Sequence, residues 1–395
     1  MNPDNLTMKN ILLPILLIHF SPIYSQWQEI NTPTSEDLNA IEIIGDNAFC
    51  GGKNGILLKS IDQGETWTEI ITPASNSIKS ILFVNTSIGF FTTSGGKVFK
   101  TINEGIDWTE KSLHTGGLNG IDFKNASIGV AVGDNGNIFK TIDGGNNWVD
   151  LGSQSIYIMN DVAFVNDTLA VAVGASGSYL FSTNTGESWT YKNINSSETF
   201  FTIEKKNSTT ASIVGTKGSY AEFSEYNLSL STISTIDVEE NWLKDIQFIH
   251  QEDSTIKTMV VGFNSTLCIE NNGWKNWNIN SINNLNGIHF YNDTVGIACG
   301  LHGKIYKTNS GGIPASRNKL TQVALSLYPI PAKNTLFIQG KFSNYKISIY
   351  NTIGQIVINQ KLYGNQIDIS KIPAGNYYIQ LNSQTKFACG RFRKK

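Results

Sequence analysis

Short apolar runs separated by turn residues fill most of this 395-residue chain. One stretch shows the pattern well, with runs over Leu118–Phe123, Ile128–Gly133 and Asn137–Thr141 and a fourth that starts at Trp148. Gly, Asn and Asp lie between the runs, which is typical of short antiparallel strands joined by tight turns. No apolar stretch keeps the helical period of about 3.6 over a helix-length window. The chain is therefore expected to be all-β.

An eight-residue segment, which we call the turn box, recurs between the third and fourth runs. Its form is Ser/Thr-x-Asp/Asn-x-Gly-x-x-Trp, and four copies span Ser60–Trp67, Thr101–Trp108, Thr141–Trp148 and Ser182–Trp189. Three degenerate copies follow, with Glu225, Asn272 and Ser310 at the Asp position. From Asp62 to Ser310 there are 248 residues over six steps, or about 41 per repeat. Four strands per repeat of about this length predict the blades of a β-propeller.

The residues of the turn box have a folding role in this prediction, not a catalytic one. A short acceptor side chain can bond backbone N–H groups two residues on, glycine supplies a positive φ, and a large ring can be buried between blades. The acceptors are Asp62, Asn103, Asp143 and Asn184, the glycines are Gly64, Gly105, Gly145 and Gly186, and the rings are Trp67, Trp108, Trp148 and Trp189.

The ends of the repeat region predict how the ring closes. The last box, Ser310–Gly312, has no tryptophan after it, so the last blade lacks its outer strand. Residues Trp27–Ile30 match Trp67–Ile70, which follow the first box. We expect residues 27–30 to supply the missing strand, which gives seven blades and hides two sheet edges.

The boxes resemble the Asp-box (BNR) repeat of sialidases. The fuller pattern, which adds Val132-Gly133-x-x-Gly136-x-Ile138-x-Lys140 before the third box, resembles the propellers of photosystem II assembly and stability factors. The resemblance covers residues 27–314 and implies that the boxes lie away from the ligand-binding face.

The N-terminus has the form of a secretory signal peptide. Lys9 precedes an apolar run over Ile11–Ile18, and Ser25 is a small residue at the expected cleavage point. A transmembrane helix needs about 20 apolar residues, so this run is too short to be an anchor. The expected organisation is a signal peptide at 1–25, a propeller at 26–314, a linker at 315–324 and a C-terminal module at 325–395.

The C-terminal module has strand-like runs that alternate every second residue, which predicts a small Ig-like β-sandwich. Its motifs are Tyr328-Pro329-x-Pro331-Ala332, Ile349-Tyr350-Asn351-x-x-Gly354-Gln355, Ile367-Asp368-Ile369-Ser370 and Ala374-Gly375-x-Tyr377. These resemble the C-terminal sorting domain of type IX secretion cargo, although Ile330 stands where that family usually has Asn. The resemblance implies contact with the type IX machinery and delivery outside the cell or to its surface. An ordinary adhesive β-sandwich is the alternative.

The composition argues against several classes of function. A net charge of −2 gives no field that would attract nucleic acid or an anionic membrane. The only arginines are Arg317, Arg391 and Arg393, all outside the repeats, so the arginine cluster that a sialidase needs is absent. The histidines lack metal-ligand spacing, and no cofactor or metal is expected. The four cysteines, Cys50, Cys268, Cys299 and Cys389, favour buried thiols over disulfide bridges.

The face opposite the boxes is the expected binding surface. One column near the start of each inner strand, which we call the mouth column, contains Asn39, Lys79, Asn119, Asn160, Phe201, Lys244 and Asn286. Loop aromatics nearby are Tyr157, Phe200, Phe201 and Trp242, and the longest loops, 234–242 and 250–255, belong to the fifth and sixth repeats.

The expected function is a non-catalytic binding or scaffold module for a protein or a glycan. The alternative is a glycoside hydrolase or lyase outside the sialidase class, for which a carboxylate pair across a deep cleft would be the evidence. Carboxylates occur on the non-repeat loops at Glu36 and Asp37, Glu239 and Glu240, and Glu252 and Asp253, but the sequence places no pair across a cleft.

Overall fold

The computed structural model describes residues 27–236, 241–250, 255–270, 274–276, 283–312, 321–322, 325–339, 345–352, 354–362, 364–382 and 386–395. The expected signal peptide and most of the expected linker lie outside these residues. The chain divides into two compact units, residues 1–314 and residues 315–395. Among the described residues, no helix has the length and apolar character needed to cross a membrane.

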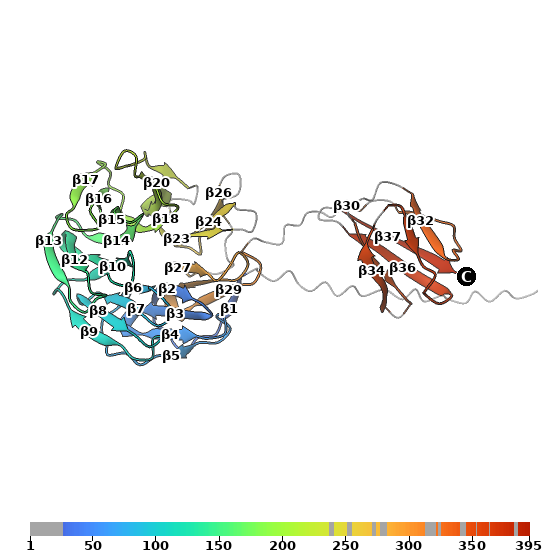
Figure 1. Ribbon diagram of the computed structural model, residues 1–395, viewed down its shortest axis with the longest axis horizontal. Helices are drawn as coiled ribbons and strands as arrows, with labels where there is room; N and C mark the ends of the chain where they lie inside the picture. Colours follow the sequence, from blue (N-terminus) through green and yellow to red (C-terminus); the bar gives the residue numbers. More distant parts are fainter. Residues whose placement is uncertain are drawn as a thin grey trace, which may run out of the picture. The chain divides into compact units, whose positions relative to one another are not determined.

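The described part of the first unit contains seven antiparallel sheets (Figure 1). The first three, from inner to outer strand, are β2 (Leu38–Ile44), β3 (Asn47–Gly52), β4 (Leu57–Ser60) and β5 (Thr68–Glu69); β6 (Ile78–Phe83), β7 (Gly89–Thr93), β8 (Lys97–Thr101) and β9 (Thr109–Ser112); and β10 (Leu118–Phe123), β11 (Gly129–Gly133), β12 (Asn137–Thr141) and β13 (Val149–Ser153). The next two are β14 (Met159–Phe164), β15 (Ala170–Gly174), β16 (Ser178–Ser182) and β17 (Thr190–Asn193); and β18 (Phe200–Lys205), β19 (Thr210–Gly215) and β20 (Ser219–Ser224) with two short outer pieces, β21 (Ser229–Leu230) and β22 (Ser234–Thr235). The last two are β23 (Leu243–His250), β24 (Ile256–Gly262), β25 (Leu267–Glu270) and β26 (Trp274–Asn276); and β27 (Leu285–Phe290), β28 (Gly296–Gly300) and β29 (Ile305–Thr308), completed by β1 (Trp27–Ile30).

The sheets are arranged as blades in a closed ring. Each inner strand contacts the inner strand of the next sheet, in the order β2, β6, β10, β14, β18, β23, β27 and back to β2. Figure 1 shows the inner strands around the centre and the outer strands at the rim. The first unit is therefore an all-β propeller, as the repeat pattern predicts.

The N-terminal strand completes the last blade. β1 pairs antiparallel with β29, with Trp27 opposite Thr308 and Ile30 opposite Ile305. The indole of Trp27 is buried and meets the ring of Phe290 edge-on at 6.0 Å between centroids. Trp27 also lies beside Gly312, in the way that Trp67 and Trp189 lie beside the glycines of their boxes. The predicted closing strand is confirmed.

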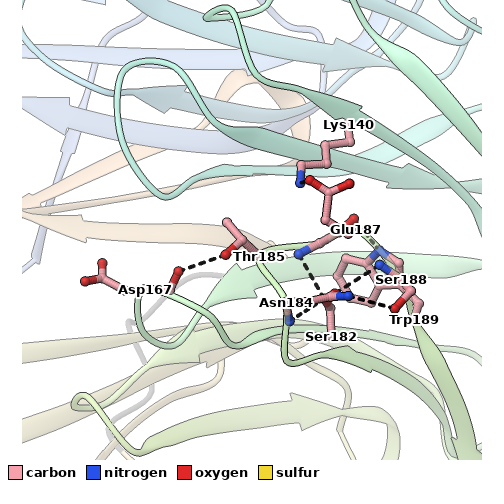
Figure 2. Close-up of polar contacts among 9 residues, drawn as sticks. Lys140, Asp167, Ser182, Asn184, Thr185, Glu187, Ser188 and Trp189 are labelled. Atoms are coloured by element: carbon pink, nitrogen blue, oxygen red, sulfur yellow. Dashed lines mark hydrogen bonds and ion pairs between the residues drawn. The ribbon is translucent and has the colours of Figure 1, made fainter.

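The turn box holds its own turn by hydrogen bonds, as Figure 2 shows for the fourth copy. The Ser182 hydroxyl donates to Asn184 Oδ1 over 2.8 Å and accepts the N–H of Gly186 over 2.8 Å. The indole N–H of Trp189 donates to the Gly186 carbonyl oxygen over 3.2 Å. The same bonds between the hydroxyl, the Asp or Asn oxygen and the glycine N–H occur in the first three boxes.

A lysine on the third strand of one blade reaches the turn box of the next blade. Lys140 is buried and forms an ion pair with Glu187, which Figure 2 also shows. Lys307, on the last blade, forms an ion pair of 2.6 Å with Glu65 in the first box, across the point where the ring closes. Lys140 belongs to the repeat pattern, but the pattern by itself indicated no role for this position. It is a link between blades.

The second unit has its own hydrophobic core and two sheets, which form a small β-sandwich. One sheet has the order β30 (Thr321–Gln322), β37 (Lys386–Lys394), β36 (Gly375–Asn382), β33 (Lys346–Tyr350) and β34 (Ile356–Lys361), and the other has the order β31 (Ser326–Tyr328), β32 (Thr335–Gln339) and β35 (Gln366–Asp368). Its core includes Ala332 from the first sequence motif and Tyr377 from the last.

Candidate channel-mouth site

The inner strands enclose a cavity of about 660 Å³ on the axis of the ring. All seven residues of the mouth column line it. In every blade the pairing register of the inner strand shifts at the column residue, for example between Leu118 and Gly120, so the column residue is the extra residue of a β-bulge. Bulges redirect side chains, which explains why the column residue lines the cavity in every blade.

The asparagines of the mouth column join neighbouring blades. Asn39 Nδ2 donates to the Ile78 carbonyl oxygen over 3.0 Å, and Asn160 Nδ2 donates to that of Phe200 over 2.7 Å. Asn119 and Asn286 make the equivalent bonds to the carbonyl oxygens of the next blades. At least one amide N–H of each asparagine is thus used within the ring, and Asn119 Nδ2 also donates to Asp134 Oδ1 over 3.3 Å. These residues are less available as ligand donors than the sequence pattern suggested.

An aromatic cluster of Phe201, Trp242 and Phe263 surrounds Lys244 at the mouth. The Lys244 ammonium lies 3.6 Å from the ring centroid of Phe201 and 5.9 Å from that of Phe263. Trp242 stacks on Phe263 at 5.0 Å and lies 5.5 Å from Phe201, with 43% of its surface exposed. These contacts combine cation–π attraction with an open indole face.

Two aromatic residues that were expected near this site have other surroundings. Phe200 is completely buried in the core between blades, and Tyr157 is half-buried against another core cluster. Phe263 was missed because it follows β24 in a loop that carries no aromatic in the other repeats. The signal for it is positional: it follows Gly262 as Asp134 follows Gly133, in the loops that enter the same face.

The mouth carries two ammonium groups. The pKa of Lys244 is lowered to about 8, mainly by burial and also by the charge of Lys79, while Asp245 opposes the shift. Among the described residues, no ion pair is found for Lys79 or Lys244. An anionic group placed between them would relieve their repulsion.

Below the mouth, acidic side chains line the cavity. They lie one or three residues after the mouth column, at Glu42, Asp122, Asp161, Glu204 and Asp245, and His289 occupies the third position in the last blade. This layer was not predicted from the sequence, although the recurrence of acidic residues one or three positions after the mouth column could have found it.

Most of the acidic side chains bond the next blade. Asp122 Oδ2 accepts the backbone N–H of Phe164 over 2.6 Å, and Asp245 Oδ2 accepts that of Ile288 over 2.8 Å. Asp161 Oδ2 accepts the N–H of Ile203 over 3.0 Å. These three carboxylates are therefore structural links between blades.

Burial sets the ionisation of this layer. It raises the pKa of Asp122 and Asp245 to about 7 and that of Asp161 to about 6, against the effect of their backbone hydrogen bonds. Burial also raises the pKa of Glu204 well above its usual range, and the other acids add to this. His289 Nδ1 lies 3.2 Å from Glu42 Oε2. Burial lowers the pKa of His289, but the charge of Glu42 and the other favourable contacts outweigh it and the net shift is upward.

From the raised pKa values of the channel acids and of His289, we expect the folded protein to gain stability as the pH falls from about 8 to about 5. Acids whose pKa is raised in the folded state take up protons there that the unfolded chain does not bind, and the raised pKa of His289 acts in the same direction. We expect the free energy of unfolding to increase by an amount on the order of 1–3 kcal/mol over this range, measured by denaturant unfolding at each pH.

Below about pH 4 the same measurement should show the opposite trend, a loss of stability as the pH falls. Asp62 and Asp143 have a pKa of about 2 because the hydrogen bonds of the turn box favour their charged forms, so their contribution is lost as the pH falls through this range. The variant Glu204→Gln should show a weaker dependence between pH 8 and pH 5. A free energy of unfolding that decreases steadily from pH 8 to pH 5 would contradict the expectation.

The remaining carboxylate candidates do not form a site in the described residues. Asp37 Oδ1 accepts the backbone N–H of His302 over 3.0 Å, which joins the first and last blades. Glu239, Glu240, Glu252 and Asp253, with most of the two long loops, lie outside the described residues. Within the described part of the chain, no group of three or more His, Cys, Asp or Glu side chains could hold a metal ion.

The second unit matches a known family. Residues 326–394 match the family described as the secretion system C-terminal sorting domain. The second unit is a type IX secretion sorting domain. The sorting domain indicates delivery to the outer surface or outside the cell, and it implies interaction with the secretion machinery. The substitution of Ile330 within the Tyr328–Ala332 motif does not prevent the match.

Solved structures resemble the propeller. One, "YCF48 bound to D1 peptide", aligns with a TM-score of 0.59 at 18% identity and covers 73% of this chain and 96% of that chain. Another, "YCF48 from Cyanidioschyzon merolae", has a TM-score of 0.59 at 17% identity and covers 72% and 98%. At this identity the likeness shows the shared fold alone. No curated protein matches the chain.

Proposed function

We propose that this protein is an exported, non-catalytic binding module that holds a protein or glycan ligand at the mouth of the propeller channel. The observation that carries the proposal is the aromatic cluster around Lys244, with the half-exposed indole of Trp242 at its edge. Exposed aromatic side chains beside a cation are typical of recognition surfaces.

The chemistry of the mouth favours a ligand with a carboxylate next to an apolar or ring face. Trp242 offers a surface on which a sugar ring or an apolar side chain can stack. Lys79 and Lys244 offer two positive charges for an acidic group. An acidic oligosaccharide and an acidic peptide segment share this chemistry. One of the similar propellers, YCF48, was solved with a bound peptide, which supports peptide binding as a use of this fold.

The proposal predicts that Trp242→Ala weakens ligand binding at least about tenfold, because truncation of a central aromatic contact commonly costs more than 1 kcal/mol. The full exported chain would be tested against arrays of acidic oligosaccharides and of acidic peptides, which separate the two sources of the carboxylate. Tyr226→Ala is the control, because Tyr226 is 85% exposed and lies near the fifth turn box, away from the mouth. Absence of saturable binding on both arrays, or equal binding by both variants, would refute the proposal.

A glycoside hydrolase or lyase is the second candidate, and Glu204 favours it. Its carboxyl lines the channel with a raised pKa, as a general acid requires, and no hydrogen bond to its side chain is found in the described residues. Cleavage of an oligosaccharide from the array that Glu204→Gln abolishes, while binding remains, would establish the enzyme in place of the binding module.

A further inference from the structure

The ring closes between its last blade and its first, and several contacts hold this seam. His289 on β27 meets Glu42 on β2, and Asn286 donates to the Leu38 carbonyl oxygen over 2.8 Å. The residues on the two sides are far apart in sequence, so folding must bring together the two ends of the propeller. Any covalent bond across the seam would hold the whole ring closed.

Two cysteines face each other across this seam. Cys50 lies on β3 of the first blade and Cys299 on β28 of the last, each just before a glycine. Both are completely buried in the same core cluster, which also contains Ile41 and Ile297 from the two blades. Burial raises the pKa of the Cys50 thiol and the neighbouring Cys299 raises it further, so the two side chains lie close together within this cluster, and both thiols are free in this structure.

The other two cysteines have different surroundings. Cys268 is buried in another core cluster, between the fifth and sixth blades, and Cys389 is exposed on β37 of the sorting domain. The pair at the seam is therefore specific, because Cys50 and Cys299 alone share a cluster.

We propose that Cys50 and Cys299 form an intramolecular disulfide that staples the closed ring after export. Structural disulfides persist in oxidising compartments outside the cytoplasm, and the sorting domain indicates that this chain enters one. The sequence favoured buried thiols at these positions, since the seam contact depends on ring closure and is not visible in the sequence.

The chemistry is thiol–disulfide exchange with a protein disulfide that acts as the oxidant in the compartment that the exported chain enters. One cysteine thiolate attacks the disulfide of the oxidant, which forms a mixed disulfide and releases one thiolate of the oxidant. The second cysteine thiolate then displaces the other. The two cysteines lose two protons and two electrons, and the oxidant leaves as a dithiol. Because both thiols are completely buried in the closed ring, the exchange takes place on the open chain as the seam forms.

The bond would join residues 249 positions apart, and closing a longer loop restricts the unfolded chain more. We therefore expect the oxidised protein to unfold at a temperature at least about 5 °C higher than the reduced protein. A break in β1 pairing would then leave the first and last blades connected.

The test is peptide mapping of the full exported chain, alkylated without reduction. We expect one linked peptide pair that contains Cys50 and Cys299, and two alkylated cysteines, Cys268 and Cys389. After reduction all four should be alkylated and the midpoint of thermal unfolding should fall. Four alkylated cysteines without reduction, or a bridge between any other two, would overturn the proposal.

Two variants distinguish the effect of the disulfide on stability from the effect of packing by buried cysteine side chains. Cys268→Ala removes a buried thiol from another cluster and should keep the effect of reduction on the midpoint. The double variant Cys50→Ala, Cys299→Ala should lose that effect. If the double variant does not fold, the mapping of the unaltered chain still decides the question. An equal shift on reduction in the double variant would also contradict the staple.

Discussion

Replacement of Trp27 by alanine is expected to destabilise the propeller by about 3–5 kcal/mol, as for other buried tryptophans. The indole is 5% exposed, meets Phe290 edge-on and fills the place that a box tryptophan has in other blades. Its loss would leave a cavity against the last blade and weaken the pairing of β1 with β29. Denaturant unfolding measures the change.

Trp242→Ala is the matched control for this experiment. It removes the same side chain from a half-exposed position at the channel mouth, so we expect a loss of less than about 1 kcal/mol. Deletion of residues 27–30 should have a larger effect than Trp27→Ala and expose the edge of β29 to aggregation. If both tryptophan variants unfold at the same denaturant concentration as the unaltered chain, β1 does not hold the ring.

Gly105→Ala is expected to cost about 2–4 kcal/mol, the sum of a backbone cost and an overpacking cost. Gly105 has a φ of +78° in the second turn box, and an added Cβ would lie 2.5 Å from Phe49 on the preceding blade. A positive φ is unfavourable for alanine, and the clash would have to push a fully buried ring. Denaturant unfolding again gives the free energy.

Gly152→Ala separates the two costs. Gly152 has nearly the same φ, +75°, but nothing lies within 4 Å of an added Cβ. This variant should therefore show only the backbone cost of about 1–2 kcal/mol. Equal losses in the two variants would mean that the box glycine does not form the contact between blades, and the structural role of the turn box would have to be revised.

Local repetition explains how much of the fold could be predicted. A turn box needs its hydroxyl, its Asp or Asn and its glycine within a few residues, so Thr141, Asp143 and Gly145 are visible as a pattern. The match between Trp27–Ile30 and Trp67–Ile70 located the closing strand for the same reason. The mouth column could be aligned because a bulge recurs at one place in every inner strand.

The candidate site depends on contacts that repetition does not contain. Phe263 stacks on Trp242, which in turn contacts Phe201, and the equivalent loop carries no Phe, Tyr or Trp in the other blades. The amides of the mouth column were expected to face a ligand, yet they bond the next blade because the ring brings backbone carbonyl oxygens to within hydrogen-bond distance, 3.0 Å for Asn39 and 2.7 Å for Asn160.

The sequence by itself determined the repeat, its strands, the closing strand and the sorting domain, since each depends on residues that are close together or on a motif that recurs. Only the tertiary structure decided which side chains meet across blades: Lys140 with Glu187, Asp245 with Ile288, and Cys50 with Cys299. Such partners lie at least one repeat apart in the chain, and the distance between them is set by the curvature and closure of the ring. Elements can be predicted from local chemistry, whereas a channel and its charges exist only once the blades enclose it.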